Sequence, residues 1–268
     1  MARFFWRLFI SFAGLLLAGC TGPAPKEVPI WQQVKISDLA GRGAAEPNQR
    51  LSDEINIDIY IFDIPAEDAN VLEDVWTLLY TQPLRFNNYD AFAANLFAAG
   101  FGEAASWNDV ANILRATGAR MAERDSLVLL DGRARNIIVT AMDSEQTVFY
   151  TSGGTSPEGI TIGPGSLALR IMAEKIPGQR GVCQMNVQPV FSSVSTSRGQ
   201  AKQKSSETVP FAFDALGIRL KISPGSYLLL GPKRYTAGAS GLAAMFFGRT
   251  APRPAARIFM FVCRAIAD

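Results

Sequence analysis

Residues 55–65 read Ile55-Asn-Ile-Asp-Ile-Tyr-Ile-Phe-Asp-Ile-Pro65, an alternation of isoleucine with polar and aromatic residues. Side chains of a β-strand point to opposite faces in turn, so a period of two residues predicts a strand. Pro65 cannot donate to a sheet ladder and predicts the end of that strand. Asp58 and Asp63 are expected on its solvated face. The stretch thus predicts a long strand at the start of the folded part.

Three helices are predicted after this strand. Residues 71–79 carry apolar side chains at helical spacing, which indicates one buried helix face. A second helix is predicted over residues 90–99, with Gly100 as its C-terminal stop. A third begins at Ser106, an N-cap with an acidic residue three positions on, and ends at Gly118.

From residue 127 onward the sequence predicts strands instead of helices. Pairs and triplets rich in Gly, Pro and Asp separate short apolar runs, which is typical of an antiparallel or mixed β fold. The predicted strands are residues 127–130, 135–141, 146–151, 166–173, 181–190, 209–213, 217–222, 227–230 and 257–264. The polar stretch at residues 192–207 is expected to be a mobile loop or an extended hairpin between two of them.

These patterns predict an α+β fold class, in which a helical segment packs on a β-rich, mixed or antiparallel domain. Residues 51–126, with one strand and three helices, are expected to belong to the same globular domain as the β-rich portion at residues 127–268.

The N-terminus has the features of an export signal. Arg3 and Arg7 precede a largely apolar run at residues 8–17, which is shorter than the roughly 20 residues needed to cross a bilayer. The run ends in Leu17-Ala-Gly-Cys20, which resembles the lipobox of bacterial lipoproteins. That resemblance implies cleavage of residues 1–19, a diacylglycerol on the Cys20 thiol, and acylation of the new amine. An ordinary secretory signal with a chance cysteine is the alternative.

The residues after Cys20 predict where such a protein is anchored. Residues 20–50 are rich in Pro, Gly, Ala and charge, which indicates a flexible tether. In the sorting rule for lipoproteins of Gram-negative bacteria, Asp after the cysteine favours the inner membrane. Thr21 therefore indicates the outer membrane, with the folded part facing the periplasm.

Composition weighs against several classes of function. The chain has no histidine, which is the usual acid–base catalyst near neutral pH and a common metal ligand. Removing Arg3 and Arg7 from 26 Lys and Arg leaves 24, equal to the 24 Asp and Glu, so the mature chain is formally neutral. We therefore expect no enzyme, no metal, no cofactor and no nucleic-acid partner, although catalysis by carboxylates or a Ser–Lys pair stays open.

Two glycine-rich segments are interpreted as loops rather than sites. Gly163-Pro-Gly165 has the outline of a dinucleotide-binding loop, but a strand pattern follows it where that loop needs a helix. Ser240 lacks both the spacing of a nucleophile elbow and a histidine to activate it.

The mature chain keeps two cysteines besides Cys20, namely Cys183 and Cys263. Export to an oxidising compartment allows them to form a disulfide. Both lie in apolar, strand-like runs, so two buried thiols are an equally open alternative.

The order of features from Ile55 to the C-terminus resembles the C-terminal domain of secretins, the ring-forming outer-membrane channels of type II and type III secretion and of type IV pili. It resembles short secretin-like lipoproteins more closely still. The segments that carry the resemblance are residues 55–65, 118–133, 165–170, 182–191, 225–232, 242–247 and 258–262.

This resemblance implies a non-enzymatic lipoprotein with a structural or accessory role in an outer-membrane assembly, acting by pairing of β-edges. Its expected partners are the membrane, through the lipid on Cys20, and further copies of itself or other envelope proteins. The alternative is a periplasm-facing lipoprotein that binds a small ligand. Its pocket would lie between residues 66–118 and the β domain, lined by residues such as Trp76, Phe92 and Phe101.

Overall fold

The alternating stretch at residues 55–65 forms strand β1 (Glu54–Pro65) in the computed structural model, and Pro65 ends it as predicted. β1 lies inside a sheet, between β14 (Ala255–Ile266) and β4 (Arg120–Leu130), and both pairings are antiparallel. Its isoleucines at positions 55–61 point into one hydrophobic core, while Tyr60 and Phe62 point into a second core on the opposite face. β1 is therefore buried on both faces.

The structure describes residues 54–153, 156–193, 211–235, 241–250 and 252–267. The predicted signal peptide (1–19), Cys20 and the tether (20–50), and most of the polar stretch (194–207) lie outside these residues.

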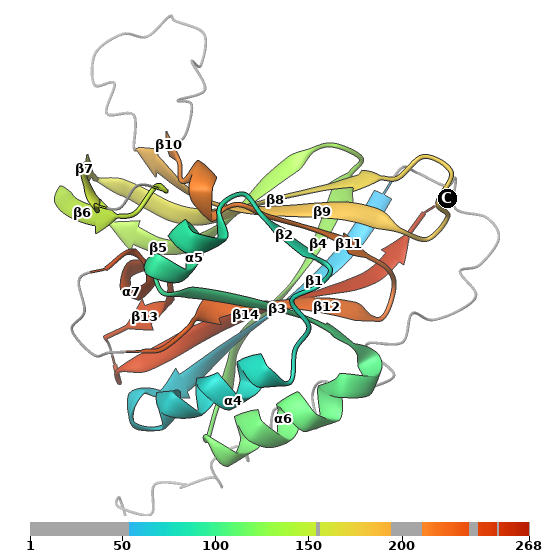
Figure 1. The fold of residues 1–268 in the computed structure, drawn as a ribbon, viewed down its shortest axis with the longest axis horizontal. Coiled ribbons are helices and arrows are strands. Elements are labelled where there is room, and N and C mark those ends of the chain that lie inside the picture. Colours follow the sequence, from blue (N-terminus) through green and yellow to red (C-terminus); the bar gives the residue numbers. More distant parts are fainter. Residues whose placement is uncertain (1–53, 154–155, 194–210, 236–240, 251, 268) are drawn as a thin grey trace, which may run out of the picture.

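Two sheets packed face to face make up most of the described fold (Figure 1). Sheet A has the order β3-β12-β14-β1-β4, with β13 paired to β14, and sheet B has the order β2-β11-β9-β8-β5, with β10 paired to β9. A small third sheet pairs β6 (Gln146–Tyr150) with β7 (Glu158–Ile162). The remaining strands are β2 (Leu84–Phe86), β3 (Phe97–Glu103), β5 (Ala134–Met142), β8 (Gly165–Lys175), β9 (Cys183–Ser193), β10 (Phe211–Ala212), β11 (Ile218–Ile222), β12 (Ser226–Pro232) and β13 (Gly248–Arg249).

Helices cover the face of sheet A that points away from sheet B, so the molecule has three layers (Figure 1). The 3-10 helix η1 (Ala66–Val71), α4 (Leu72–Thr77) and α6 (Trp107–Ala116) form this outer layer. α5 (Tyr89–Ala94) and α7 (Leu242–Phe247) instead pack their apolar residues into the core between the two sheets. Short 3-10 turns, η2 (Ala104–Ser106) and η3 (Asp214–Leu216), complete the helices. The pairings are antiparallel, and the α+β class is confirmed.

The second predicted helix is wrong in its C-terminal half. α5 ends at Ala94, Leu96 turns the chain with a φ of 62°, and residues 97–99 already belong to β3. Gly100 lies within that strand rather than at a helix end. A Cβ at Gly100 would lie 2.4 Å from the Cβ of Leu79, so glycine allows the helical layer to approach the strand closely.

The other two helices match their predictions except at their ends. The first is split into η1 and α4 and ends at Thr77. The third is α6, and Gly118 follows it with a φ of 63°, as predicted. Ser106 does not cap α6 through its side chain, because its Oγ donates to the carbonyl of Glu103 (2.9 Å) and shares a hydrogen bond with the Tyr227 hydroxyl (2.9 Å).

Each strand predicted after residue 127 has a counterpart in the structure. The largest difference is β4, which begins at Arg120 instead of Leu127. β9 begins at Cys183, and the described part of the strand predicted at 209–213 is β10. Strands β2, β3, β7 and β13 were not predicted.

Candidate functional site

Strands β4 and β5 form free edges of the two sheets. β4 is the last strand of sheet A, β5 is the last strand of sheet B, and residues 131–133 join them. Neither pairs with a strand on its outer side in the described part of the chain. β4 has 11 residues and β5 has 9, against about 5–6 in a typical strand. These long edges offer backbone N–H and C=O groups to a further strand.

Charged residues, which oppose pairing with a further strand, occur only in the first half of β4. Residues 120–125 include two arginines and two acidic residues, whereas residues 126–130 carry no charge. In this second half Val128 and Leu130 are 44% and 53% exposed, and Ile138 of β5 is 66% exposed. We call residues 126–130 and Ile138 the apolar edge. Their neighbours Leu127, Leu129, Ile137 and Val139 face the core between the sheets, so Val128 and Leu130 lie on the outer face of sheet A and Ile138 on that of sheet B. Uncharged edge strands of this kind can pair with a further strand.

A buried carboxylate fastens β4 to the rest of sheet A. Asp58 of β1 is 5% exposed and accepts a hydrogen bond from Ser126 Oγ at 2.6 Å. It also pairs with Arg264 Nε at 2.8 Å and Arg124 at 3.4 Å, and the Tyr60 hydroxyl donates to it at 3.3 Å. The prediction that Asp58 lies on a solvated face is therefore wrong.

Asp63 departs from the same prediction. It forms a two-pronged pair with Arg257 of β14, at 2.8 and 3.1 Å, and its side chain is 24% exposed. Both aspartates of β1 thus hold neighbouring strands.

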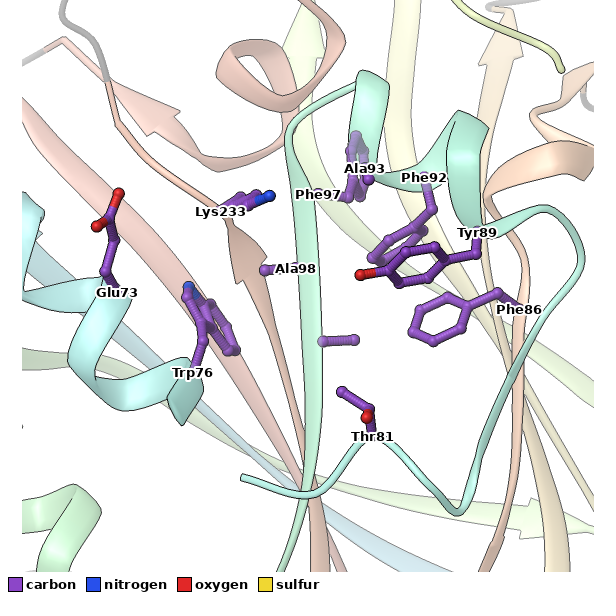
Figure 2. A pocket seen from close by; sticks show the side chains of 11 residues that line it. Glu73, Trp76, Thr81, Phe86, Tyr89, Phe92, Ala93, Phe97, Ala98 and Lys233 are labelled. Atoms are coloured by element: carbon purple, nitrogen blue, oxygen red, sulfur yellow. The ribbon is translucent and has the colours of Figure 1, made fainter. Parts of the chain in front are cut away.

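An aromatic cleft of about 340 Å³ lies beside β3 (Figure 2). Phe86, Tyr89, Phe92 and Phe97 form a continuous run of rings along one side, with neighbouring centroids 4.8–5.5 Å apart. Trp76 of α4 lies on the opposite side, where its indole N–H donates to the carbonyl of Pro232 at 3.2 Å. The cleft is therefore walled by aromatic rings held by packing and by one hydrogen bond.

Polar groups reach this cleft from its mouth and from the edge of β3. Glu73 and Lys233 lie at the end that Trp76 occupies (Figure 2). Phe101 exchanges both backbone hydrogen bonds with Tyr80, so the odd-numbered residues of β3 turn their backbone groups away from β12. Ala99 therefore presents its N–H and C=O to the side of the cleft.

The pocket predicted between the helical segment and the β domain is found here in part. Trp76 and Phe92 line the cleft as predicted, whereas Phe101 lies farther along β3, packed against the core. Phe86, Tyr89 and Lys233 were missed. Aromatic residues are frequent at positions 86–97, and this frequency could have indicated the cleft. Lys233 follows β12, and nothing in the sequence connects it with Trp76.

The two cysteines lie together, although they belong to different sheets. Cys183 begins β9 in sheet B, Cys263 lies in β14 of sheet A, and both are fully buried in the same core. The interaction between the two thiols lowers the pKa of Cys183 and, together with burial, raises that of Cys263. Both are thiols in this structure, so the disulfide stays a prediction.

A strand, β8, follows Gly163-Pro-Gly165, so its interpretation as a turn is confirmed, while Ser240 lies outside the described residues. Among the residues that the structure describes, His, Cys, Asp and Glu form no group of three suited to a metal ion. Within that same part of the chain, every helix falls short of the length and apolarity that a membrane-spanning helix requires.

Comparison with solved structures gives a distant structural likeness. No protein-family model matches the chain, and no curated protein matches it. The fold is weakly similar to the secretin-domain β-barrel of InvG from the Salmonella SPI-1 injectisome base, with a TM-score of 0.21 and 11% identity. The match covers 81% of this chain and 64% of the InvG chain, so it spans less than two thirds of that protein. The secretin-like assignment stays a prediction.

Proposed function

We propose that this chain is a non-enzymatic, lipid-anchored structural or accessory protein of the bacterial envelope, which assembles with further copies of itself through the apolar edge. The single observation that carries the assembly is that edge: two long terminal strands, with Val128, Leu130 and Ile138 exposed. Lipid anchoring at Cys20 would confine the copies to one membrane surface and raise their local concentration, which favours pairing. Other envelope proteins are the alternative partners.

Introducing positive charge on the apolar edge is expected to prevent this assembly. Lysine on an edge strand opposes strand pairing, so Val128→Lys combined with Ile138→Lys should weaken self-association at least about tenfold. Both side chains are exposed, so the unfolding midpoint should stay unchanged. Native mass spectrometry of the detergent-extracted chain over a concentration series measures the effect.

Phe149→Lys is the matched control, because Phe149 is 61% exposed but belongs to β6, which pairs with β7 and is not part of the apolar edge. It should leave the oligomers unchanged. A parent chain that stays strictly monomeric in mild detergent at high concentration would contradict the proposal.

The anchor has its own test. The lipobox-like Leu17-Ala-Gly-Cys20 supports cleavage before Cys20 and triple acylation. Mass spectrometry of the mature N-terminus should find residues 1–19 removed and acyl chains on Cys20. A free Cys20 thiol in protein isolated from cells would refute the anchor while leaving the assembly open.

A second candidate function, binding of a small and largely apolar ligand, is favoured by the aromatic cleft. The rings offer a stacking surface, and the backbone of Ala99 offers one donor and one acceptor. An aromatic ligand would fit this chemistry.

Tyr89→Ala is expected to weaken binding of an aromatic fluorescent probe about tenfold, because Tyr89 lines the cleft. Tyr80→Ala is a closely matched control: both tyrosines are 60% exposed, and Tyr80 does not line the cleft. Fluorescence titration with 1-anilinonaphthalene-8-sulfonate distinguishes the two variants. Equal losses in both, or no saturable binding by the parent, would argue against a ligand site.

A further inference from the structure

The two buried cysteines flank the place where the chain crosses from one sheet to the other. Residues 223–225 form a short turn from β11 in sheet B to β12 in sheet A. Cys183 is the register partner of Ile222, the last residue before this turn. Gly225, the last residue of the turn, donates its N–H to the carbonyl of Cys263 at 3.0 Å. The sheets therefore converge at the two cysteines.

The side chains of this pair meet inside the core. Both residues are 0% exposed and both belong to the core between the sheets. Their thiols interact, which shifts the two pKa values in opposite directions. A disulfide requires the two Cβ atoms to lie about 3.5–4.5 Å apart. Two cysteines that flank one short turn and face the same core are well placed to meet this condition. The geometry thus favours a covalent bond over two independent thiols.

We propose that Cys183 and Cys263 form a disulfide that joins sheet A to sheet B when the chain folds in an oxidising environment. In the cell this rests on the proposed export of the chain, since such bonds persist outside the cytoplasm. The chain has one further cysteine, Cys20. It is the proposed lipid attachment site, so its thiol would not compete with this pair.

The oxidant is a disulfide, either of a small molecule or of an oxidised protein dithiol. The Cys183 thiolate attacks one sulfur of that disulfide, forms a mixed disulfide and expels the first thiolate. Cys263 loses its proton and attacks the Cys183 sulfur, which forms the internal bond and expels the second thiolate. Two electrons and two protons pass to the oxidant, which becomes two thiols. Because both cysteines are buried in the folded chain, this exchange takes place before the sheets close.

Refolding of the full chain with glutathione tests the proposal without relying on export. The unfolded, reduced chain is refolded in mixed reduced and oxidised glutathione, treated with iodoacetamide under denaturing conditions, and mapped by mass spectrometry. We expect the peptides that contain Cys183 and Cys263 to be cross-linked to each other and to carry no iodoacetamide label. When a reductant is added before the iodoacetamide, both peptides should be labelled. Alkylation of both residues without added reductant would overturn the proposal.

Thermal unfolding gives an independent readout. The bond closes a loop of roughly 80 residues, so the oxidised chain should unfold on the order of 10 °C above the reduced chain. In a Cys263→Ala variant the midpoint should no longer respond to reductant. A parent chain whose midpoint ignores reductant would overturn the proposal even if the variant fails to fold.

Protein isolated from cells distinguishes this inference from the proposed anchor. Lipid on Cys20 together with two alkylatable thiols would overturn the disulfide and leave the anchor standing. A Cys183–Cys263 bond with an unlipidated Cys20 would support the disulfide and refute the anchor.

Discussion

We expect the Phe247→Ala variant to lose about 3–5 kcal/mol of unfolding free energy, because truncating a buried phenylalanine leaves a cavity that its neighbours fill only partly. Phe247 is the last residue of α7 and is fully buried. Its ring centroid lies 4.9 Å from that of Phe97 and 6.2 Å from those of Phe246 and Phe259. Since these rings come from α7, β3 and β14, the cavity would open where three elements meet. Urea unfolding followed by circular dichroism measures the loss.

Phe149→Ala is the control for this experiment. The same atoms are removed, but Phe149 is 61% exposed, so we expect a change of about 0.5 kcal/mol or less. Similar losses in both variants would mean that α7 does not pack in the core. Phe97 contacts Phe247 and also lines the aromatic cleft. Phe247→Ala should therefore also make the wall of the cleft less rigid, so that the fluorescent probe binds there in more than one orientation.

The strands that bury a face could be predicted from the sequence, because burial imposes a period of two. β11 alternates between core and surface, and β8 does so over most of its length. β1 alternates isoleucine with polar and aromatic residues because its two buried faces belong to different cores. Turns rich in glycine and proline marked their ends. The α+β class follows from these elements alone, since it needs only their types and order.

β3 could not be predicted, because its pattern is set by contacts with distant residues. Its sequence, Phe97-Ala-Ala-Gly-Phe-Gly-Glu103, lacks β-branched residues and contains two glycines, which disfavour both helix and strand. Those glycines are explained only by the fold: a Cβ at Gly102 would lie 2.2 Å from the Tyr227 ring, just as Gly100 lies against Leu79. Local propensity carries no information about either neighbour.

The first part of β4 could not be predicted for a related reason. Residues 120–126 are mostly exposed, so their charged side chains fall on both faces of the strand and show no alternation. A strand that pairs on one side only buries fewer side chains, so its sequence shows a weaker alternation of apolar and polar residues. Edge strands, which are free to pair with another chain, are therefore the hardest strands to recognise from sequence.

The cysteine pair shows what the sequence can and cannot specify about a site. Export and apolar surroundings left disulfide and thiols equally open, since spacing along the chain says nothing of distance across two sheets. Only the convergence of β9 and β14 at the 223–225 turn brings Cys183 to Cys263.

We expect Asp58→Ala to destabilise the fold by about 3 kcal/mol and to release β4 from sheet A. Breaking a buried ion pair by removing one partner typically costs about 3–5 kcal/mol, because the remaining charge loses its compensation. Here the partners Arg264 and Arg124 keep 27% and 41% of their side-chain surface exposed and can turn to water, which places the expected loss at the lower end. Ser126 on β4 would also lose its 2.6 Å hydrogen bond to Asp58.

The loss of stability should appear first as local opening of β4 and only then as unfolding of the whole chain. Asp58 joins β1 to β4 through Ser126 and Arg124, and to β14 through Arg264, but β14 is also held by β12 on its other side. β4 has no second neighbour in the described part of the chain, so its amides should gain the most in hydrogen exchange. Asp143→Ala, which removes an exposed carboxylate, should leave both exchange and stability within about 0.5 kcal/mol of the parent. If Asp58→Ala exchanges uniformly across sheet A, the carboxylate stabilises the sheet as a whole rather than holding its edge. Faster exchange in β4 alone would instead show that the buried Asp58 side chain holds β4, the strand that carries most of the apolar edge, in sheet A.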